Sequence, residues 1–310
     1  MTTEVRAGSA EQRQLLTEMI AAGHLIESGV PGLYGHGPVY ETVREQLSAV
    51  VSDLAAGEVQ TKMSFPPVVS RRLLETNGYI GNFPHLAGSI FGFEGSEADA
   101  MLQGERAAAH QDWSECQCQT DVMMLPAACY PVYPELAARG PLALDGQTVD
   151  IGATWVFRRE PSEDPARRQS FRMHELIRAG RPDEVAAWRL AWADRGVQLF
   201  AELGLAGKLV NANDPFFGRA GRLLAANQSA EEVKLELEVQ ISAPAPTACA
   251  SFNYHASHFG DIWGLRLEDG STAHTACTAF GQDRIVLALM SVHGLDPDRW
   301  PSSVRERLGG

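Results

Sequence analysis

The chain has 310 residues, of which 45% are hydrophobic, so it is long enough to fill one large core or two small ones. Its formal net charge of -13 argues against attraction of the whole molecule to nucleic acid, although a local basic site remains possible. No apolar run is long enough to span a membrane, and the N-terminus lacks the features of a signal peptide. Five scattered cysteines fit a reducing compartment, so we expect a cytoplasmic protein.

Helix and strand signals both occur in the first third of the chain. Apolar spacing predicts helices over residues 10–28, 38–56 and 68–77. A strand is predicted at 58–65, and Pro66 and Pro67 confine it to an edge of the sheet. Mixed turn and strand are expected over 82–93, and a polar helix over 94–113.

A strand predicted at 116–124 carries Cys116 and Cys118. Both sulfur atoms would lie on one face of that strand, because residues two apart share a face. A packed pair of small hydrophobic side chains suits this spacing better than a metal site, which stays open as the alternative.

Residues 153–157 and 170–175 predict a hairpin with an arginine-rich loop. Arg158, Arg159 and Glu160 follow the first strand, and Arg167 and Arg168 precede the second. Arginine suits carboxylate or phosphate binding because its planar guanidinium forms two parallel charge-assisted hydrogen bonds and keeps its charge. From residue types alone, a hairpin with its charges facing water remains the alternative.

The remaining sequence predicts one long helix and several strands. The helix covers 183–203, with an apolar face made by Val185, Trp188, Trp192, Leu199 and Leu203. Strands are predicted at 233–241, 249–254 and 274–280, and an apolar helix begins at 281. Because strands and helices do not alternate regularly, the order predicts an α+β fold with an antiparallel β-sheet flanked by helices.

Three segments in this order resemble motifs 1, 2 and 3 of the class II aminoacyl-tRNA synthetases. They are residues 38–67, Phe157-Arg158-Arg159-Glu160, and the run from Ala279 to Arg284, in which Ala279 and Asp283 replace the usual glycine and glutamate. The resemblance is densest to zinc-dependent archaeal seryl-tRNA synthetases and to their truncated homologues, the amino acid:carrier protein ligases. Further matching stretches are 32–37, 126–134, 157–162, 169–173, 213–218, 251–255 and 258–260.

The resemblance implies a class II catalytic core as one domain over 1–310, with an N-terminal helical segment over 1–30 and a homodimer formed through motif 1. It also implies an ATP site. Arg158 would hold the α-phosphate and Arg284 the γ-phosphate, while Glu160 and Phe171 would bind the adenine. Arg167 and Arg168 would add phosphate contacts, and Ala250 and Ser251 would complete the site. Fixed guanidinium groups offset the repulsion that arises when a carboxylate approaches the α-phosphate.

Magnesium is expected on the phosphates of ATP. Glu236 and Glu238 share a strand face, so either could reach the ATP, the substrate or the metal. A solvated strand face is the open alternative for these two glutamates.

Cys129, Glu175 and Cys277 match the three zinc ligands of the resembling enzymes. Three protein ligands leave one coordination position open, which the α-amino group of the substrate would take. Glu175, Glu238, Asn253 and His255, with His258 nearby, would line the amino acid site. For the histidines, packing against the backbone is the alternative.

Only about 30 residues precede Gly32, so we expect no tRNA-binding arm, and no broad basic surface is visible. The resemblance therefore implies that ATP activates a small amino acid, glycine or alanine, and that the acceptor is the phosphopantetheine thiol of a carrier protein. Arg219 and Arg222 are candidates for carrier docking, with a plain solvated helix as the alternative. A synthetase acting on tRNA and a non-catalytic paralogue stay open as other functions.

Overall fold

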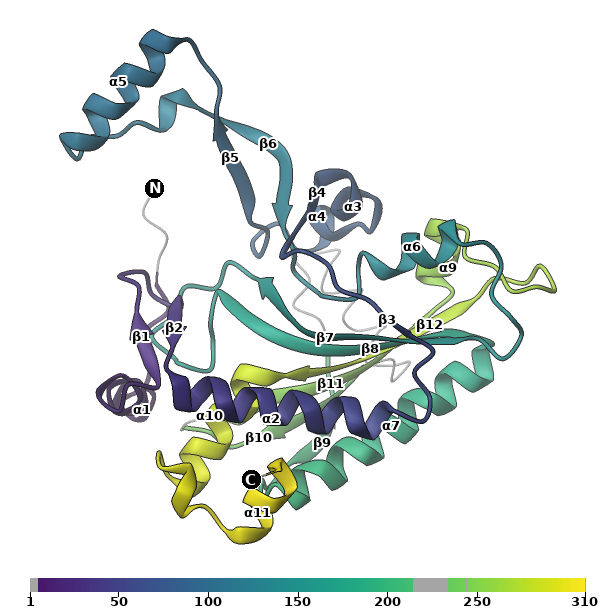
Figure 1. Ribbon diagram of the computed structural model, residues 1–310. Helices are drawn as coiled ribbons and strands as arrows, with labels where there is room; N and C mark the ends of the chain where they lie inside the picture. Colours follow the sequence, from purple (N-terminus) through teal and green to yellow (C-terminus); the bar gives the residue numbers. More distant parts are fainter. Residues whose placement is uncertain (1–4, 214–233, 243–244, 310) are drawn as a thin grey trace.

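A seven-stranded sheet forms the centre of the computed structural model, which describes residues 5–213, 234–242 and 245–309 (Figure 1). The strand order is β3 (Thr61–Lys62), β7 (Gln147–Phe157), β8 (Ser170–Gly180), β12 (His274–Gly281), β11 (Thr247–Ala256), β10 (Lys234–Val239) and β9 (Lys208–Asn211). Only the β3–β7 pair is parallel among these strands. The predicted α+β class with an antiparallel sheet is confirmed, and β3 lies at the edge, shorter than predicted.

Helices cover one face of the sheet and form the largest core with it. They are α1 (Ala10–Ala21), α2 (Pro38–Ala55), α7 (Pro182–Glu202), α10 (Gln282–His293) and α11 (Ser302–Leu308), the last preceded by the short turn η2 (Pro297–Arg299). The predicted apolar face of α7 is buried as a whole, from Val185 to Leu203. Burial of Trp192 and of Phe252 on β11 fixes α7 against the sheet.

The opposite face carries shorter helices. These are α3 (Arg71–Thr76), α4 (Tyr79–Asn82), α6 (Val132–Ala138) and α9 (His258–Trp263), which belong to two smaller cores. Tyr133 of α6 stacks on Phe259 of α9 with ring centroids 4.0 Å apart. This thinner layer leaves room for a pocket above the sheet.

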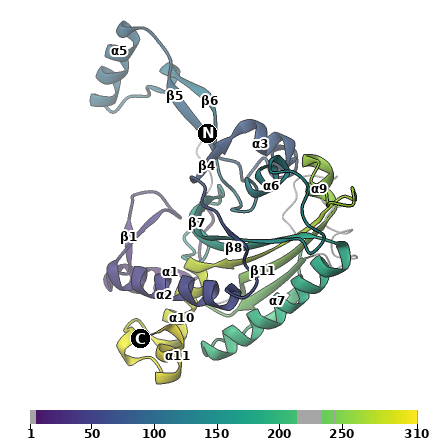
Figure 2. The same cartoon turned by 45° about the vertical axis from the view of Figure 1, so that its right-hand side comes forward.

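An arm projects from the body in both views (Figures 1 and 2). It contains β5 (Ser89–Phe93), α5 (Glu97–Ala108), the turn η1 (Ser114–Cys116) and β6 (Gln117–Met124), and β4 (Val68–Ser70) extends its sheet. No residue of α5 is buried. The prediction of a packed Cys116–Cys118 pair is wrong: Cys118 is exposed and Cys116 partly so, because no second layer formed by the described residues covers the arm.

Three predicted helices have different bounds, and the one expected over 94–113 covers only Glu97–Ala108. The helix predicted over 10–28 ends at Ala21, and the chain turns at Gly23, with φ +73°, into β1 (Leu25–Glu27), which pairs with β2 (Tyr34–His36). The helix predicted from residue 68 begins only after Ser70, whose hydroxyl accepts a hydrogen bond from the N–H of Leu73 at 3.3 Å. In the part of the chain that the structure covers, we find no helix with the length and apolarity to cross a membrane.

Candidate active site

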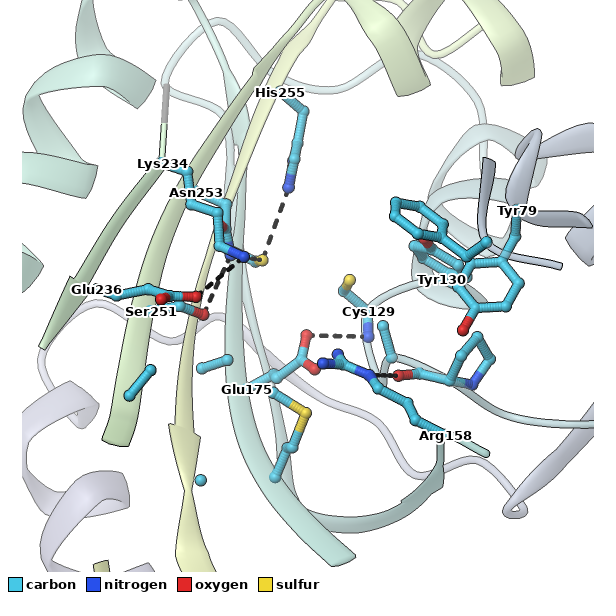
Figure 3. Close-up of a pocket in the computed structure, with 18 of the residues that line it drawn as sticks. Tyr79, Cys129, Tyr130, Arg158, Glu175, Lys234, Glu236, Ser251, Asn253 and His255 are labelled. Atoms are coloured by element: carbon cyan, nitrogen blue, oxygen red, sulfur yellow. Dashed lines mark hydrogen bonds and ion pairs between the residues drawn. The ribbon is translucent and has the colours of Figure 1, made fainter. Parts of the chain in front are cut away.

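A cavity of about 530 Å³ lies between the sheet and the α3, α4, α6 and α9 layer (Figure 3). Most of the residues expected at the site line it: Cys129, Arg158, Phe171, Glu175, Glu236, Ala250, Ser251, Asn253, His255, His258, Cys277 and Arg284. Glu160, Arg167, Arg168 and Glu238 are not among its lining residues. Arg219 and Arg222 lie outside the described residues.

The register of the sheet brings these distant positions together. Across β10, β11 and β12, Lys234 lies opposite Asn253, which lies opposite Cys277. In the next row on the same face, Glu236 lies opposite Ser251, followed by Ala279 and then Glu175 on β8. Directly opposed residues of antiparallel strands share a face, so both rows point into the pocket.

Cys129, Glu175 and Cys277 form a compact buried cluster. Their ligand atoms all lie within 4.8 Å of one another, and each residue is at most 4% exposed. The Glu175 carboxylate accepts hydrogen bonds from the backbone N–H groups of Ala128 at 3.0 Å and Cys129 at 3.1 Å. Two thiols and a carboxylate at this spacing suit zinc, which prefers sulfur, nitrogen and carboxylate ligands in a tetrahedral arrangement.

The protonation of the cluster reflects its burial. Burial and the neighbouring charge of Cys277 raise the pKa of Glu175 to about 7. Hydrogen bonding between the sulfur atoms raises the pKa of Cys129 above, and lowers that of Cys277 below, the ordinary thiol value. The three acidic groups therefore share protons that a bound cation would displace, which agrees with a metal site.

Polar groups surround the sulfur of Cys277. The Asn253 side-chain amide nitrogen lies 3.4 Å from Cys277 Sγ, and His255 Nε2 lies 3.7 Å from it. On its other side, His255 Nδ1 lies 3.2 Å from Thr275 Oγ1 and 3.5 Å from the hydroxyl of Tyr133. Such contacts orient a ligand and tune its charge.

Two arginines occupy another part of the pocket. Arg158 donates from Nε to the carbonyl of Pro126 at 3.1 Å, and its guanidinium lies 5.6 Å from the ring centroid of Phe171. Arg284 donates to the carbonyls of Ala166 and Ala248, each at 2.8 Å. Burial, and after it the charges of Arg167 and Arg158, lower the pKa of Arg284. Positive charge is thus concentrated where a polyphosphate would be stabilised.

Three predicted nucleotide ligands are placed differently from the expectation. The Arg167 guanidinium forms an ion pair with the Glu160 carboxylate, with Nη1 and Oε1 2.5 Å apart, and neither residue lines the pocket. Arg168 is 4% exposed and donates to the carbonyl of Pro165 at 2.8 Å, with its Nη1 2.8 Å from Nε2 of His36. The expected phosphate contact of Arg168 does not agree with this buried position.

The buried carboxylate near Arg168 belongs to Asp283, the residue that departs from the usual motif 3. Its carboxylate accepts a 2.6 Å hydrogen bond from the N–H of Arg172 and lies 3.8 Å from Arg168. The burial of Asp283 gives a physical reason for the inward position of Arg168.

Glu238 lies outside the pocket for another reason. The register shifts between Leu237 and Glu238, which pairs with Ala248. Such a bulge bends the strand beyond it and changes the direction of its side chains.

Several pocket residues were missed by the sequence reasoning, among them Lys234, Asn77 and Tyr79. The Lys234 amine lies 3.0 Å from the Glu236 carboxylate, and Figure 3 shows Tyr79 on the opposite side of the pocket. The sequence gives a weak signal for Lys234, because lysine is rare in this chain: only three of the 26 basic residues are lysines. Nothing in the local sequence marks Asn77 or Tyr79.

Curated proteins similar to this chain include two bacterial ligases. The chain is 44% identical over 284 residues to amino acid–acyl-carrier-protein ligase 2 of Bradyrhizobium diazoefficiens, covering 91% of this chain and 84% of that protein. Ligase 1 of the same organism is 42% identical over 91% of this chain and 86% of its own length. The type-2 serine–tRNA ligase of Methanopyrus kandleri is 25% identical, over 87% of this chain and 56% of its own. No family model matches the chain.

Solved structures share the fold. The crystal structure of M. kandleri seryl-tRNA synthetase in complex with A. aeolicus tRNASec has a TM-score of 0.76 and 20% identity, and this chain spans 61% of its length. Prolyl-tRNA synthetase from Cryptosporidium parvum, complexed with L-proline and AMP, has a TM-score of 0.65 and 13% identity. The class II synthetase core expected from the three motifs is therefore confirmed as the fold.

Proposed function

Because the chain belongs to the amino acid–acyl-carrier-protein ligases, we propose that it activates an amino acid with ATP and transfers the aminoacyl group to a carrier protein. The observation that carries the proposal is one pocket that joins the Cys129–Glu175–Cys277 cluster to Arg158 and Arg284. A site for an amine therefore lies beside a site for phosphates. The chain acts in this proposal as one catalytic domain.

In the first step, a carboxylate oxygen of the amino acid attacks the α-phosphorus of ATP. The new P–O bond forms as the bond to the β-phosphate oxygen breaks, and pyrophosphate leaves with that electron pair. Arg158 and Arg284 stabilise the charge on the phosphates, and Phe171 supports the adenine ring. Magnesium would accompany the phosphates, with Glu236 in reach of the pocket.

Cys129, Glu175 and Cys277 would hold a zinc ion. When bound, zinc would offer its open coordination position to the α-amino group of the substrate. Asn253 and His255 keep the Cys277 sulfur oriented, and the two backbone N–H groups keep Glu175 in place. We propose a small substrate, glycine or alanine, as the family resemblance implies.

In the second step, the phosphopantetheine thiol of the carrier protein attacks the acyl carbon of the aminoacyl-adenylate. A C–S bond forms, the C–O bond to the phosphate breaks, AMP leaves with the electron pair and the thiol proton passes to solvent. A reducing cytoplasm would keep the five free cysteines reduced. A homodimer through motif 1, residues 38–67, is part of the proposal, and this segment includes β3 at the edge of the sheet.

Amino-acid-dependent exchange of pyrophosphate into ATP tests the first step. We expect exchange with glycine or alanine that is lost after chelation and restored by zinc. Labelled amino acid should then pass to a carrier protein with phosphopantetheine, and neither to the same carrier without it nor to bulk tRNA. Exchange with no amino acid, in zinc-loaded protein, would refute the proposal, and charging of tRNA would favour the synthetase alternative.

A further inference from the structure

Strand β7 carries a β-bulge beside the metal cluster. Two of its residues, Ile151 and Gly152, stand opposite the single residue Glu175 of β8. The register of the two strands shifts there, between Asp150 and Ala153. Gly152 has φ +64°, the left-handed conformation that glycine adopts with least strain. The pairing of β8 with β12 runs past the same point without a shift, so the extra residue of the β7 bulge bends β7 alone.

The β7 bulge decides which side chains of this strand face the pocket. After it, Val156 lies opposite Phe171, which lines the pocket, so the even-numbered residues have this orientation. Before it the odd-numbered residues have it, because one added residue moves every later side chain to the other face. Pairing continues to Arg158, whose N–H donates to the carbonyl of Gln169 at 2.8 Å. Without the extra residue, Arg159 would take the place that Arg158 has in the pocket.

A buried polar network holds the β7 bulge. The Asp150 carboxylate accepts hydrogen bonds at Oδ1 from the N–H of Gly152 at 2.7 Å and from Nε2 of His174 at 2.9 Å. Its Oδ2 accepts from the hydroxyl of Ser52, on α2, at 3.1 Å. Because a carboxylate only accepts, Nε2 of His174 carries a proton, and Nδ1 lies 3.0 Å from the hydroxyl of Ser48, also on α2. Asp150 is 3% exposed and His174 is fully buried, so little water competes for these bonds.

His174 joins this network to the metal cluster because it directly precedes Glu175 on β8. Successive side chains of a strand point to opposite faces, so His174 faces α2 while Glu175 faces the pocket. The ring is fixed on one face by Asp150, and the carboxylate is fixed on the other by the N–H groups of Ala128 and Cys129. The orientation of Glu175 therefore depends on contacts made on both faces of the sheet.

We propose that Asp150, Gly152 and His174 are positioning residues for the reaction. By holding the β7 bulge they aim Glu175 into the metal cluster and place Arg158 in the pocket. The described residues that line the pocket include none of the three, so they act through Glu175 and Arg158 and touch no substrate. The inference rests on the proposed function, which gives those two residues their roles.

Two replacements of His174 separate this role from the loss of a buried ring. In His174→Gln the amide nitrogen reaches the place of Nε2 and can keep the hydrogen bond to Asp150. In His174→Asn the shorter side chain reaches only the place of Nδ1, so it can keep Ser48 as a partner and loses Asp150. Both variants lose the ring, so their melting temperatures should fall by similar amounts.

Zinc affinity and pyrophosphate exchange should tell the two variants apart. Competition with a chromophoric chelator, without substrate, should give a zinc affinity within about threefold of wild type for His174→Gln. The affinity of His174→Asn should be about 10–100-fold lower, as for other contacts behind a metal ligand. In exchange, kcat/KM for ATP should fall about 100-fold in His174→Asn, because misplacement by about 1 Å has an effect of that size.

Gly152→Ala tests the β7 bulge itself. No atom lies within 4 Å of the added methyl group, so only the backbone is strained. Gly270→Ala is the matched control, because Gly270 has φ +84°, is equally open and lies in an exposed turn. Both variants should lose a similar amount of melting temperature, and only Gly152→Ala should bind zinc about tenfold more weakly.

Equal zinc affinity in His174→Asn and His174→Gln would overturn the inference, and so would equal zinc affinity in Gly152→Ala and Gly270→Ala. Normal exchange in the wild type and in all four variants contradicts the positioning role and leaves the proposed function intact. The expected differences in zinc affinity, in a protein whose wild type exchanges no pyrophosphate, support the positioning of Glu175 and refute the proposed function. A wild type that binds no zinc refutes the positioning of Glu175 as a ligand.

Discussion

Glu175 accepts a hydrogen bond from the backbone N–H of Cys129 at 3.1 Å, although 46 residues separate the two in the chain. The proposed metal ligand on β8 is therefore oriented by the segment that carries a second proposed ligand. The same hairpin carries Arg158 at the end of its other strand. One pair of strands would thus set the distance between the proposed amine site and the proposed α-phosphate site.

Replacing Glu175 by glutamine should abolish adenylation and spare ATP binding. The amide cannot supply the anionic ligand of the cluster, and its NH₂ faces one of the two backbone N–H groups that donate to the carboxylate. We expect pyrophosphate exchange to fall more than about 100-fold, together with loss of bound zinc by elemental analysis. Titration calorimetry should give nearly the same ATP affinity. Glu135→Gln, on the exposed part of α6, is the control, and an unchanged exchange rate in E175Q would contradict the proposed role.

Asn253→Ala should weaken metal binding without removing a ligand. The Asn253 amide lies 3.4 Å from Cys277 Sγ, and outer contacts of this kind contribute about 10–100-fold to metal affinity. Competition with a chromophoric chelator measures the change. Ser251→Ala removes the other partner of Asn253, at 3.3 Å, and should leave affinity within about threefold. Equal zinc affinity in Asn253→Ala and wild type would count against the contact.

Arg284→Lys should raise the KM for ATP and lower the exchange rate. Lysine keeps the charge but cannot donate to Ala166 and Ala248 while also binding phosphate. A loss of about 100-fold in kcat/KM for ATP is expected, as for other fixed donors to transition-state charge. Arg299→Lys makes the same change on the surface and should have no effect. Similar kinetics for the two variants would rule out a phosphate contact by Arg284.

Arg168→Lys distinguishes the buried position of Arg168 from the phosphate role expected from the sequence. Because the guanidinium is bonded to Pro165 and His36, its loss should cost about 1–3 kcal/mol of unfolding free energy, measured by urea denaturation. The KM for ATP in the folded enzyme should change little. A large rise in KM with unaltered stability would restore the phosphate role.

The contribution of His36 to stability should fall as the pH drops from 6.5 to about 4, while the raised pKa of Glu175 acts in the opposite direction over this range in the metal-free protein. Burial lowers the pKa of His36 to about 4, so the unfolded chain takes up a proton on this group before the folded one does. Arg168, Arg172, Glu41 and Asp283 face the ring. The shift corresponds to about 3 kcal/mol, present above pH 6.5 and lost progressively toward pH 4.

Urea denaturation of the wild type and of His36→Gln at several pH values measures this contribution as the difference between the two stability profiles from pH 6.5 to 4.5. Below that window Glu41 contributes in the same direction. Burial opposes its ionisation, but hydrogen bonds from Arg172 outweigh this and lower the pKa of Glu41 to about 2. An equally steep dependence in His36→Gln between pH 6.5 and 4.5 would show that another group titrates there.

Much of the fold could be predicted because the strands and helices have strong local patterns. The face of α7 from Val185 to Leu203 and the alternation in β10 are properties of single elements. The cluster of Cys129, Glu175 and Cys277 could be found only through the family resemblance, since the atoms meet through strand register and not through sequence spacing.

The structure differs from the expectations where tertiary context decides. Arg168 has the same local appearance as a phosphate ligand, but the buried carboxylate of Asp283 lies near it. Cys118 has the sequence pattern of a core residue on a strand, yet β6 lies in the projecting arm, and the described residues leave Cys118 exposed there. Asn77 and Tyr79 carry no motif, and their place in the wall of the pocket becomes visible only when the fold is assembled.

The chain leaves the body along β5 and returns along β6, and Phe91 lies directly opposite Gln119. The Cα atoms of such a pair are only about 4.5–5.5 Å apart, so the whole arm begins and ends at one point in space. Its length can consequently vary between related chains, or be shortened by design to a two-residue turn, without shifting the register of the seven-stranded sheet. The arm is thus free to change during evolution independently of the catalytic pocket.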